Sequence, residues 1–71
     1  MTNKIVKVLT ARETQILKLI CQEKTNLEIA KKLKISEYGV DYHRRNLYKK
    51  TGAKTIIGLF KVAIKNNIVK L

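Results

Sequence analysis

Residues 25–46 read TNLEIAKKLKISEYGVDYHRRN, and this stretch decides the fold. It begins with a capping box, because the Thr25 hydroxyl can accept from the third amide of a helix while Glu28 reaches back. The apolar residues behind this cap repeat at helical spacing: Ile29, Ala30 and Leu33. A short helix ending near residue 32 or 33 is therefore expected, and Ser36 is placed to cap the next one. Two helices joined by a tight turn at residues 33–36 match the helix-turn-helix pattern.

The second helix of this pair is predicted over residues 37–50, with Gly52 as its left-handed C-terminal cap. One face of this helix carries Val40, His43 and Leu47, which we expect to point inward. The opposite face carries two aromatic residues followed by two cations: Tyr38, Tyr42, Arg45 and Lys49. The major groove of duplex DNA admits one helix, and a stripe of this kind suits it.

Further helices are predicted on both sides of the pair. A second capping box, Thr10 with Glu13, opens a helix over about residues 11–22, and Thr55 caps a last helix over about residues 56–66. The expected fold is all-α, with four short helices, a central helix-turn-helix and no strands. Residues 1–7 are expected to form an N-terminal tail, and residues 8–71 the single domain.

The charge of the chain indicates a polyanionic partner. Its 71 residues suffice for one small domain, and they include 16 Lys and Arg against 5 Asp and Glu, a formal net charge of +11. All five acids lie in the first 41 residues. From Tyr42 to the end there are eight cations and no acid, so the second half of the chain is the expected electrostatic footprint.

Composition also excludes several classes of function. One cysteine and one histidine can form neither an internal disulfide nor a structural zinc site. No constellation for catalysis is visible, since the single serine (Ser36) is a predicted cap, and Cys21 is expected to pack within a helix. No cofactor or metal is expected. No apolar run approaches the roughly 20 residues that cross a bilayer, and the N-terminus has no signal-like segment, so a cytoplasmic location is expected.

Several motifs resemble the LuxR/FixJ/NarL class of helix-turn-helix domains, which includes GerE-like regulators. The motifs are LTARE at residues 9–13, KTNLEIA at 24–30, LKIS at 33–36, Val40 and His43, and RRN at 44–46 with Lys50-x-Gly52. They occur in the family's order and spacing, and the resemblance spans about residues 8–69. The closing segment, residues 58–66, is similar to response regulators of the Bacteroidetes type.

This resemblance implies a bacterial transcriptional regulator that binds double-stranded DNA through the helix at 37–50. The family positions that meet bases correspond here to Asp41, Tyr42 and Arg45. The chain is expected to be the output domain of a longer response regulator, with a stand-alone regulator as the alternative. RNA polymerase is a further expected partner.

The residues themselves allow two roles at each of these positions. Arg45 can fork onto guanine O6 and N7 or hold a phosphate, and Tyr42 can pack on a thymine methyl or lie on the domain surface. Asp41 can accept from cytosine N4 or form an ion pair with Arg44 or Arg45. His43 is expected at the rim of the core, with a phosphate contact as the alternative. Phosphate contacts, or else a plain solvated face, are expected of Thr25, Asn26, Tyr38, Arg44, Lys49, Lys50 and Lys54.

The last helix is expected to mediate a homodimer on DNA. It holds more apolar residues than one core-facing stripe requires, and an exposed apolar patch often marks an interface. The predicted interface comprises Ile56, Phe60, Ala63 and Ile64. The alternative is that these side chains close a small core.

Three positions depart from the family pattern. Gly39 stands where the family usually has Thr, Thr51 where it has Leu, and Ile56 where it has Arg. Gly39 removes a hydroxyl that could contact phosphate and lowers helix propensity by about 1 kcal/mol.

Other binding functions remain open at this point. The fourth region of sigma factors shares the LTARE-like opening, although residues 40–46 fit the LuxR pattern better. A basic non-specific RNA binder and a membrane-surface protein are the rivals from other classes.

Overall fold

The computed structural model describes residues 9–70. Four helices follow one another: α2 (Ala11–Cys21), α3 (Asn26–Leu33), α4 (Glu37–Thr51) and α5 (Ile56–Lys65). No strand occurs among the described residues. The all-α prediction is confirmed, and each helix begins and ends within one residue of the expected position. The predicted tail over residues 1–7 lies outside the described residues, as do Val8 and Leu71.

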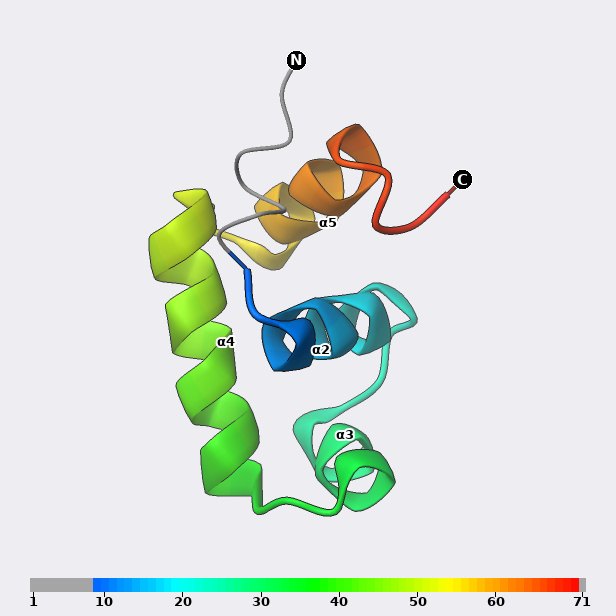
Figure 1. Ribbon diagram of the computed structural model, residues 1–71, viewed down its shortest axis with the longest axis vertical. Helices are drawn as coiled ribbons and strands as arrows, with labels where there is room; N and C mark the ends of the chain where they lie inside the picture. The colour runs from blue at the N-terminus through cyan, green and yellow to red at the C-terminus, as the bar shows by residue number, and fades with distance from the viewer. Residues whose placement is uncertain (1–8, 71) are drawn as a thin grey trace.

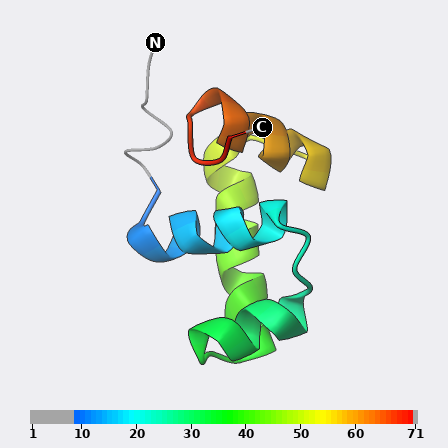
Figure 2. The same ribbon diagram turned by 90° about the vertical axis from the view of Figure 1, so that its right-hand side faces the viewer.

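The longest helix, α4, stands along one side of the molecule (Figure 1). Helices α2 and α3 both pack on it, and α5 contacts α2 and the C-terminal part of α4. Seen from the side, α2 and α3 lie across α4 rather than along it (Figure 2). One long face of α4 is therefore covered by other helices, and the opposite face is left uncovered.

Hydroxyl caps fix the start of every helix. The four N-caps are Thr10, Thr25, Ser36 and Thr55. Each side-chain oxygen accepts from the amide three residues further on, at 2.9 to 3.1 Å. Both predicted capping boxes are present: the Glu13 carboxylate accepts from the Thr10 amide at 2.9 Å, and the Glu28 carboxylate accepts from the Thr25 amide at 2.8 Å. Such caps each contribute about 1 kcal/mol, which matters in a domain of this size.

The core gathers one apolar stripe from each helix. Its largest fully buried side chains are Ile16, Leu17, Ile29, Val40, Leu47 and Leu59. Of the three predicted inward residues of α4, Val40 and Leu47 are 0% exposed and His43 is half-buried. Their burial fixes the rotation of α4 about its axis, and so fixes which of its residues face solvent.

Left-handed residues end α3 and α4. Lys34 (φ 59°) ends α3, and the Ile35 amide donates to the Ala30 carbonyl at 3.0 Å, so that the chain turns directly into Ser36. Gly52 (φ 75°) ends α4 as predicted. Beside it, the Thr51 hydroxyl donates to the Leu47 carbonyl at 2.7 Å and accepts from the Ala53 amide at 3.2 Å. Thr51 thus closes the helix with two hydrogen bonds of its side chain.

Candidate nucleic-acid interface

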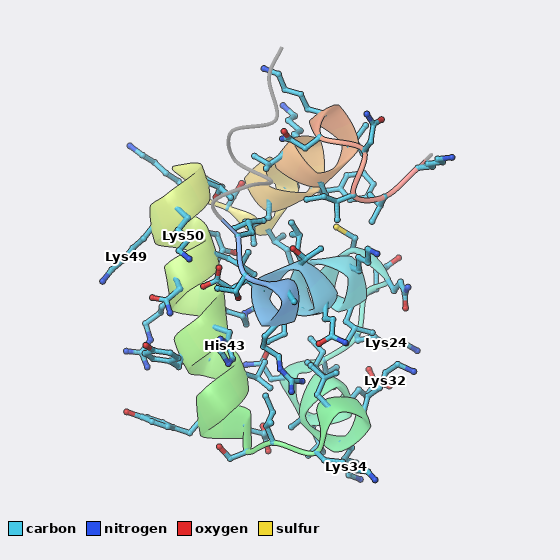
Figure 3. All side chains as sticks on the ribbon, in the orientation of Figure 1. Lys24, Lys32, Lys34, His43, Lys49 and Lys50 are labelled. Carbon is cyan, nitrogen blue, oxygen red and sulfur yellow. The ribbon has the colours of Figure 1, made fainter. Side chains whose placement is uncertain are left out.

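The uncovered face of α4 carries the stripe that the sequence predicts. Tyr38 is 76% exposed and Tyr42 is 56% exposed, and Arg45 and Lys49 are exposed as well. Figure 3 shows Lys49 extending away from the body of the molecule. Because Val40 and Leu47 anchor the opposite face, this stripe is presented outward as a unit.

Within this stripe, Asp41 and Arg45 form an ion pair. Arg45 Nη2 donates to Asp41 Oδ2 at 2.9 Å, one helical turn apart. Both side chains are more than half exposed, at 60% for Arg45 and 51% for Asp41. Of the two roles open for Asp41, the local ion pair is therefore realised in the free domain, with Arg45 as the partner.

His43 sits between the exposed stripe and the core, as expected of a rim residue. It is half-buried, and its ring meets the Tyr42 ring edge to face, with centroids 5.4 Å apart. Its Nδ1 is buried without a hydrogen-bond partner. His43 therefore contacts Tyr42 of the exposed stripe through its ring.

The other predicted phosphate ligands lie on α4, just after its end, and at the start of α3. Arg44 is half-exposed beside the stripe, and Lys54 is exposed beyond the end of α4. Thr25 and Asn26 lie at the start of α3, where Thr25 is exposed and its oxygen accepts from the Glu28 amide at 3.1 Å. The Thr25 backbone hydrogen bond lowers the pKa of the Glu28 carboxyl, so this acid stays ionised beside the helix start.

Lys50 is placed differently from its neighbours, because it is paired with an acid of another helix, and its phosphate contact stays a prediction. Its Nζ donates to Glu13 Oε1 at 2.8 Å, and its side chain is only 31% exposed. Burial opposes ionisation of Glu13, but the hydrogen bonds from Lys50 and from the Thr10 amide, together with the Lys50 charge, lower its pKa. Lys50 thus joins the end of α4 to the start of α2. Sequence reasoning missed this pair because its members are 37 residues apart.

A second group of cations points elsewhere. Lys24 and Lys32 lie on the side of the molecule opposite to the exposed face of α4, and Lys34 lies at its lower end (Figure 3). The α4 stripe is therefore a separate surface and not part of a uniform positive coat.

The predicted dimer surface is partly exposed. Ile56 is 50% exposed and Phe60 37%, and Ile64 is half-buried, whereas Ala63 is 0% exposed and belongs to the core. Ala63 is therefore wrong as an interface residue. Ile57, at 64% exposure, is the most exposed apolar side chain of α5 and was not included. Beside it lies a hollow between α2 and α5, lined by Ile20, Cys21, Glu23, Ile56, Ile57 and Phe60.

Other chemistry finds little support in the described part of the chain. Burial raises the pKa of the Cys21 thiol, which keeps it protonated and a poor nucleophile. Across residues 9–70, no group of three or more His, Cys, Asp or Glu side chains could hold a metal ion. None of the helices described is both long and apolar enough to span a bilayer.

Two helices joined by a tight turn, the second with an uncovered aromatic and cationic face, define a helix-turn-helix domain of the DNA-binding class. The model of one family, described as bacterial regulatory proteins of the luxR family (GerE), matches residues 7–63. The chain belongs to this family.

Curated relatives carry the names of regulators. The chain is 44% identical over 61 residues to the transcriptional regulatory protein MctR of Rhizobium johnstonii, covering 86% of this chain and 28% of the relative. It is 43% identical over 60 residues to the uncharacterized response regulatory protein YgeK of Escherichia coli, covering 84% of this chain and 41% of the relative. It is 36% identical over 64 residues to the oxygen regulatory protein NreC of Staphylococcus aureus, covering 90% and 30% respectively.

The chain thus spans well under half the length of each of these relatives. No solved structure matches it significantly. The closer likeness to response regulators of the Bacteroidetes type stays a prediction.

Proposed function

We propose that this domain binds double-stranded DNA sequence-specifically, with α4 in the major groove, as the output domain of a longer bacterial transcriptional regulator. The observation that carries the proposal is the rotation of α4: Val40 and Leu47 are fully buried, while Tyr38, Tyr42 and Arg45 are exposed in one stripe. Membership of a family of regulatory proteins and the net charge of +11 support the same function. Binding to chromosomal DNA would place the domain in the cytoplasm.

Base contacts are assigned to Tyr42 and Arg45, while Asp41, which the family resemblance also places near the bases, is paired with Arg45 in the free domain. Arg45 forks onto guanine O6 and N7, and Tyr42 packs on a thymine methyl group. Phosphates on either side of the groove are held from two directions, by the start of α3 and by α4 with the segment after it. The assigned phosphate ligands are Thr25, Asn26, Tyr38, Arg44, Lys49 and Lys54. Lys50 adds positive charge near this surface while it holds Glu13.

Two copies are proposed to bind together through α5. The exposed apolar side chains at its start, Ile56, Ile57 and Phe60, are the surface available for a symmetric contact. Two α4 helices would then meet half-sites about one helical turn apart. RNA polymerase is the further partner proposed for the complete regulator.

In-vitro selection from a random duplex library at physiological salt tests the function. The proposal predicts enrichment of an inverted repeat with a guanine in each half. Arg45→Ala should relax the preference at that guanine by about 1–3 kcal/mol, whereas Lys49→Ala should weaken all duplexes alike and leave the motif unchanged. Uniform retention of all sequences, lost at higher salt, would refute sequence-specific binding.

A further inference from the structure

Asp41 is the acid of α4 that is paired with the exposed stripe, through Arg45, and its position is a physical puzzle. The chain has no acid after it, and it lies within one turn of Tyr38 and Arg45 on the surface assigned to DNA. A carboxylate brought close to phosphates is repelled by them, so Asp41 by itself weakens any complex with DNA.

Fold stability does not explain the residue. Its pair with Arg45 is exposed on both sides, and exposed ion pairs one turn apart add little to stability. The Asp41 side chain is 51% exposed and lies outside the buried core. What the pair does change is the state of Arg45, whose Nη2 is held at 2.9 Å.

We propose that Asp41 is a specificity-determining residue that acts through Arg45; this inference rests on the proposed function. Asp41 holds one N–H of the guanidinium and keeps the group over the groove-facing stripe, so that the remaining N–H donors are presented to a guanine edge. Arg45 has five donors in a fixed fork, and one carboxylate bond leaves enough of them for a bidentate base contact.

The same pair penalises non-cognate DNA. On a sequence without the guanine, the best alternative for Arg45 is a phosphate. To reach it, Arg45 must leave Asp41, and the free carboxylate then lies unpaired beside the DNA backbone. Asp41 thus lowers the affinity for all other sequences more than for the cognate one, which is discrimination by repulsion.

Two predictions separate this role from others. Asp41→Asn should tighten binding to random duplex several-fold and reduce the ratio of cognate to random affinity by about threefold to tenfold, a part of the roughly 5- to 150-fold discrimination that one bidentate base contact supplies. On random duplex, its salt dependence should steepen by about one counterion, because Arg45 then reaches a phosphate.

Glu37→Gln is the matched control. Glu37 lies on the same helix, is exposed, and forms no ion pair among the described residues. Its replacement by Gln removes the same single negative charge as Asp41→Asn. It should tighten cognate and random duplex by the same factor. An equal effect of Asp41→Asn and Glu37→Gln on the affinity ratio would reduce Asp41 to a general charge and overturn the proposal.

The deciding experiment is a double-mutant cycle of Asp41→Asn and Arg45→Ala, with affinities measured by fluorescence anisotropy on the selected duplex and on random duplex. If Asp41 acts through Arg45, adding Asp41→Asn to Arg45→Ala changes the affinity ratio no further. If Asp41→Asn still lowers the affinity ratio by the same factor in the Arg45→Ala background, and only for duplexes with one particular cytosine, Asp41 contacts that base directly. This result would overturn the inference. If the wild type selects no motif, the proposed function itself fails. If it selects one that Asp41→Asn leaves unaltered, only this inference fails.

Discussion

Lys49 and Lys50 are adjacent on α4 and carry the same charge, but they have different partners and therefore different roles. Lys49 extends into solvent, whereas Lys50 holds the nearly buried Glu13. Removing Lys50 leaves a carboxylate that is 3% exposed without its cationic partner. We therefore expect Lys50→Ala to lower the free energy of unfolding by about 1–2 kcal/mol, discounted for the partial exposure of the lysine.

Urea unfolding followed by circular dichroism measures this difference. Lys49→Ala is the control, and it should leave the unfolding midpoint unchanged while weakening DNA binding. Equal stability of the two variants would show that the Glu13 pair adds nothing to the fold.

Glu13 also makes the stability of the domain depend on pH. Its pKa in the folded domain lies below the ordinary value of 4.5. For a lowered pKa, the stabilisation is fully present above the unfolded value and is lost as the pH falls through the folded one. The wild type should therefore be more stable than Glu13→Gln at pH 7, and this advantage should shrink below about pH 4.5. An advantage that is constant from pH 7 to pH 3 would contradict the assignment.

At the scale of the helix, the glycine in the first turn of α4 and the glycine that caps its C-terminus should respond differently to substitution. At Gly39, a Cβ would meet its nearest neighbour, Ser36 Oγ, at 3.4 Å, which is ordinary contact. At Gly52 there is open space, but the φ of +75° strains any other residue. Gly39→Ala should therefore raise the free energy of unfolding by about 0.5–1 kcal/mol, and Gly52→Ala should lower it by about 1 kcal/mol.

Thermal unfolding of the two variants checks these signs. A loss of stability in Gly39→Ala would mean that the start of α4 needs glycine for its backbone. Gly39→Thr tests DNA binding rather than stability, since it introduces the hydroxyl that is usual in the family. It should tighten binding to all duplexes if that hydroxyl reaches a phosphate.

The helices were predictable from the sequence because their ends are marked locally. Four hydroxyl caps and Gly52 each act within three or four residues, so Thr10, Thr25, Ser36 and Thr55 could be read directly. The exposed stripe of α4 followed from Val40 and Leu47, whose spacing leaves one orientation of the helix. What remained hidden depends on tertiary packing. The Lys50–Glu13 pair joins distant segments, and α5 is apolar on too many sides for its wheel to separate buried Ala63 from exposed Ile57.

At the scale of the whole molecule, the exposed apolar side chains of α5 and the stripe of α4 lie on different helices. Replacing exposed residues of α5 should therefore separate dimer formation from DNA reading. The double variant Ile56→Ser with Ile57→Ser removes two side chains that are 50% and 64% exposed and keeps the buried Leu59. We expect it to lose cooperative binding to a two-half-site duplex and to bind a single half-site as the wild type does.

Band-shift titration on both duplexes measures this cooperativity. Lys61→Ser, an exposed change further along the same helix, is the control. Cooperative binding that survives the double variant would place the contact between copies on another surface.

The surface that meets DNA is the central claim, and amide chemical-shift mapping tests it most directly. The ¹⁵N-labelled domain is titrated with a short duplex at physiological salt, and each shifted amide is assigned. We predict the largest shifts along the exposed side of α4, from Tyr38 to Lys49, and at the start of α3 around Thr25, with little change near Lys32 and along α5. Shifts centred on Lys32 or on α5, with α4 unperturbed, would contradict this account.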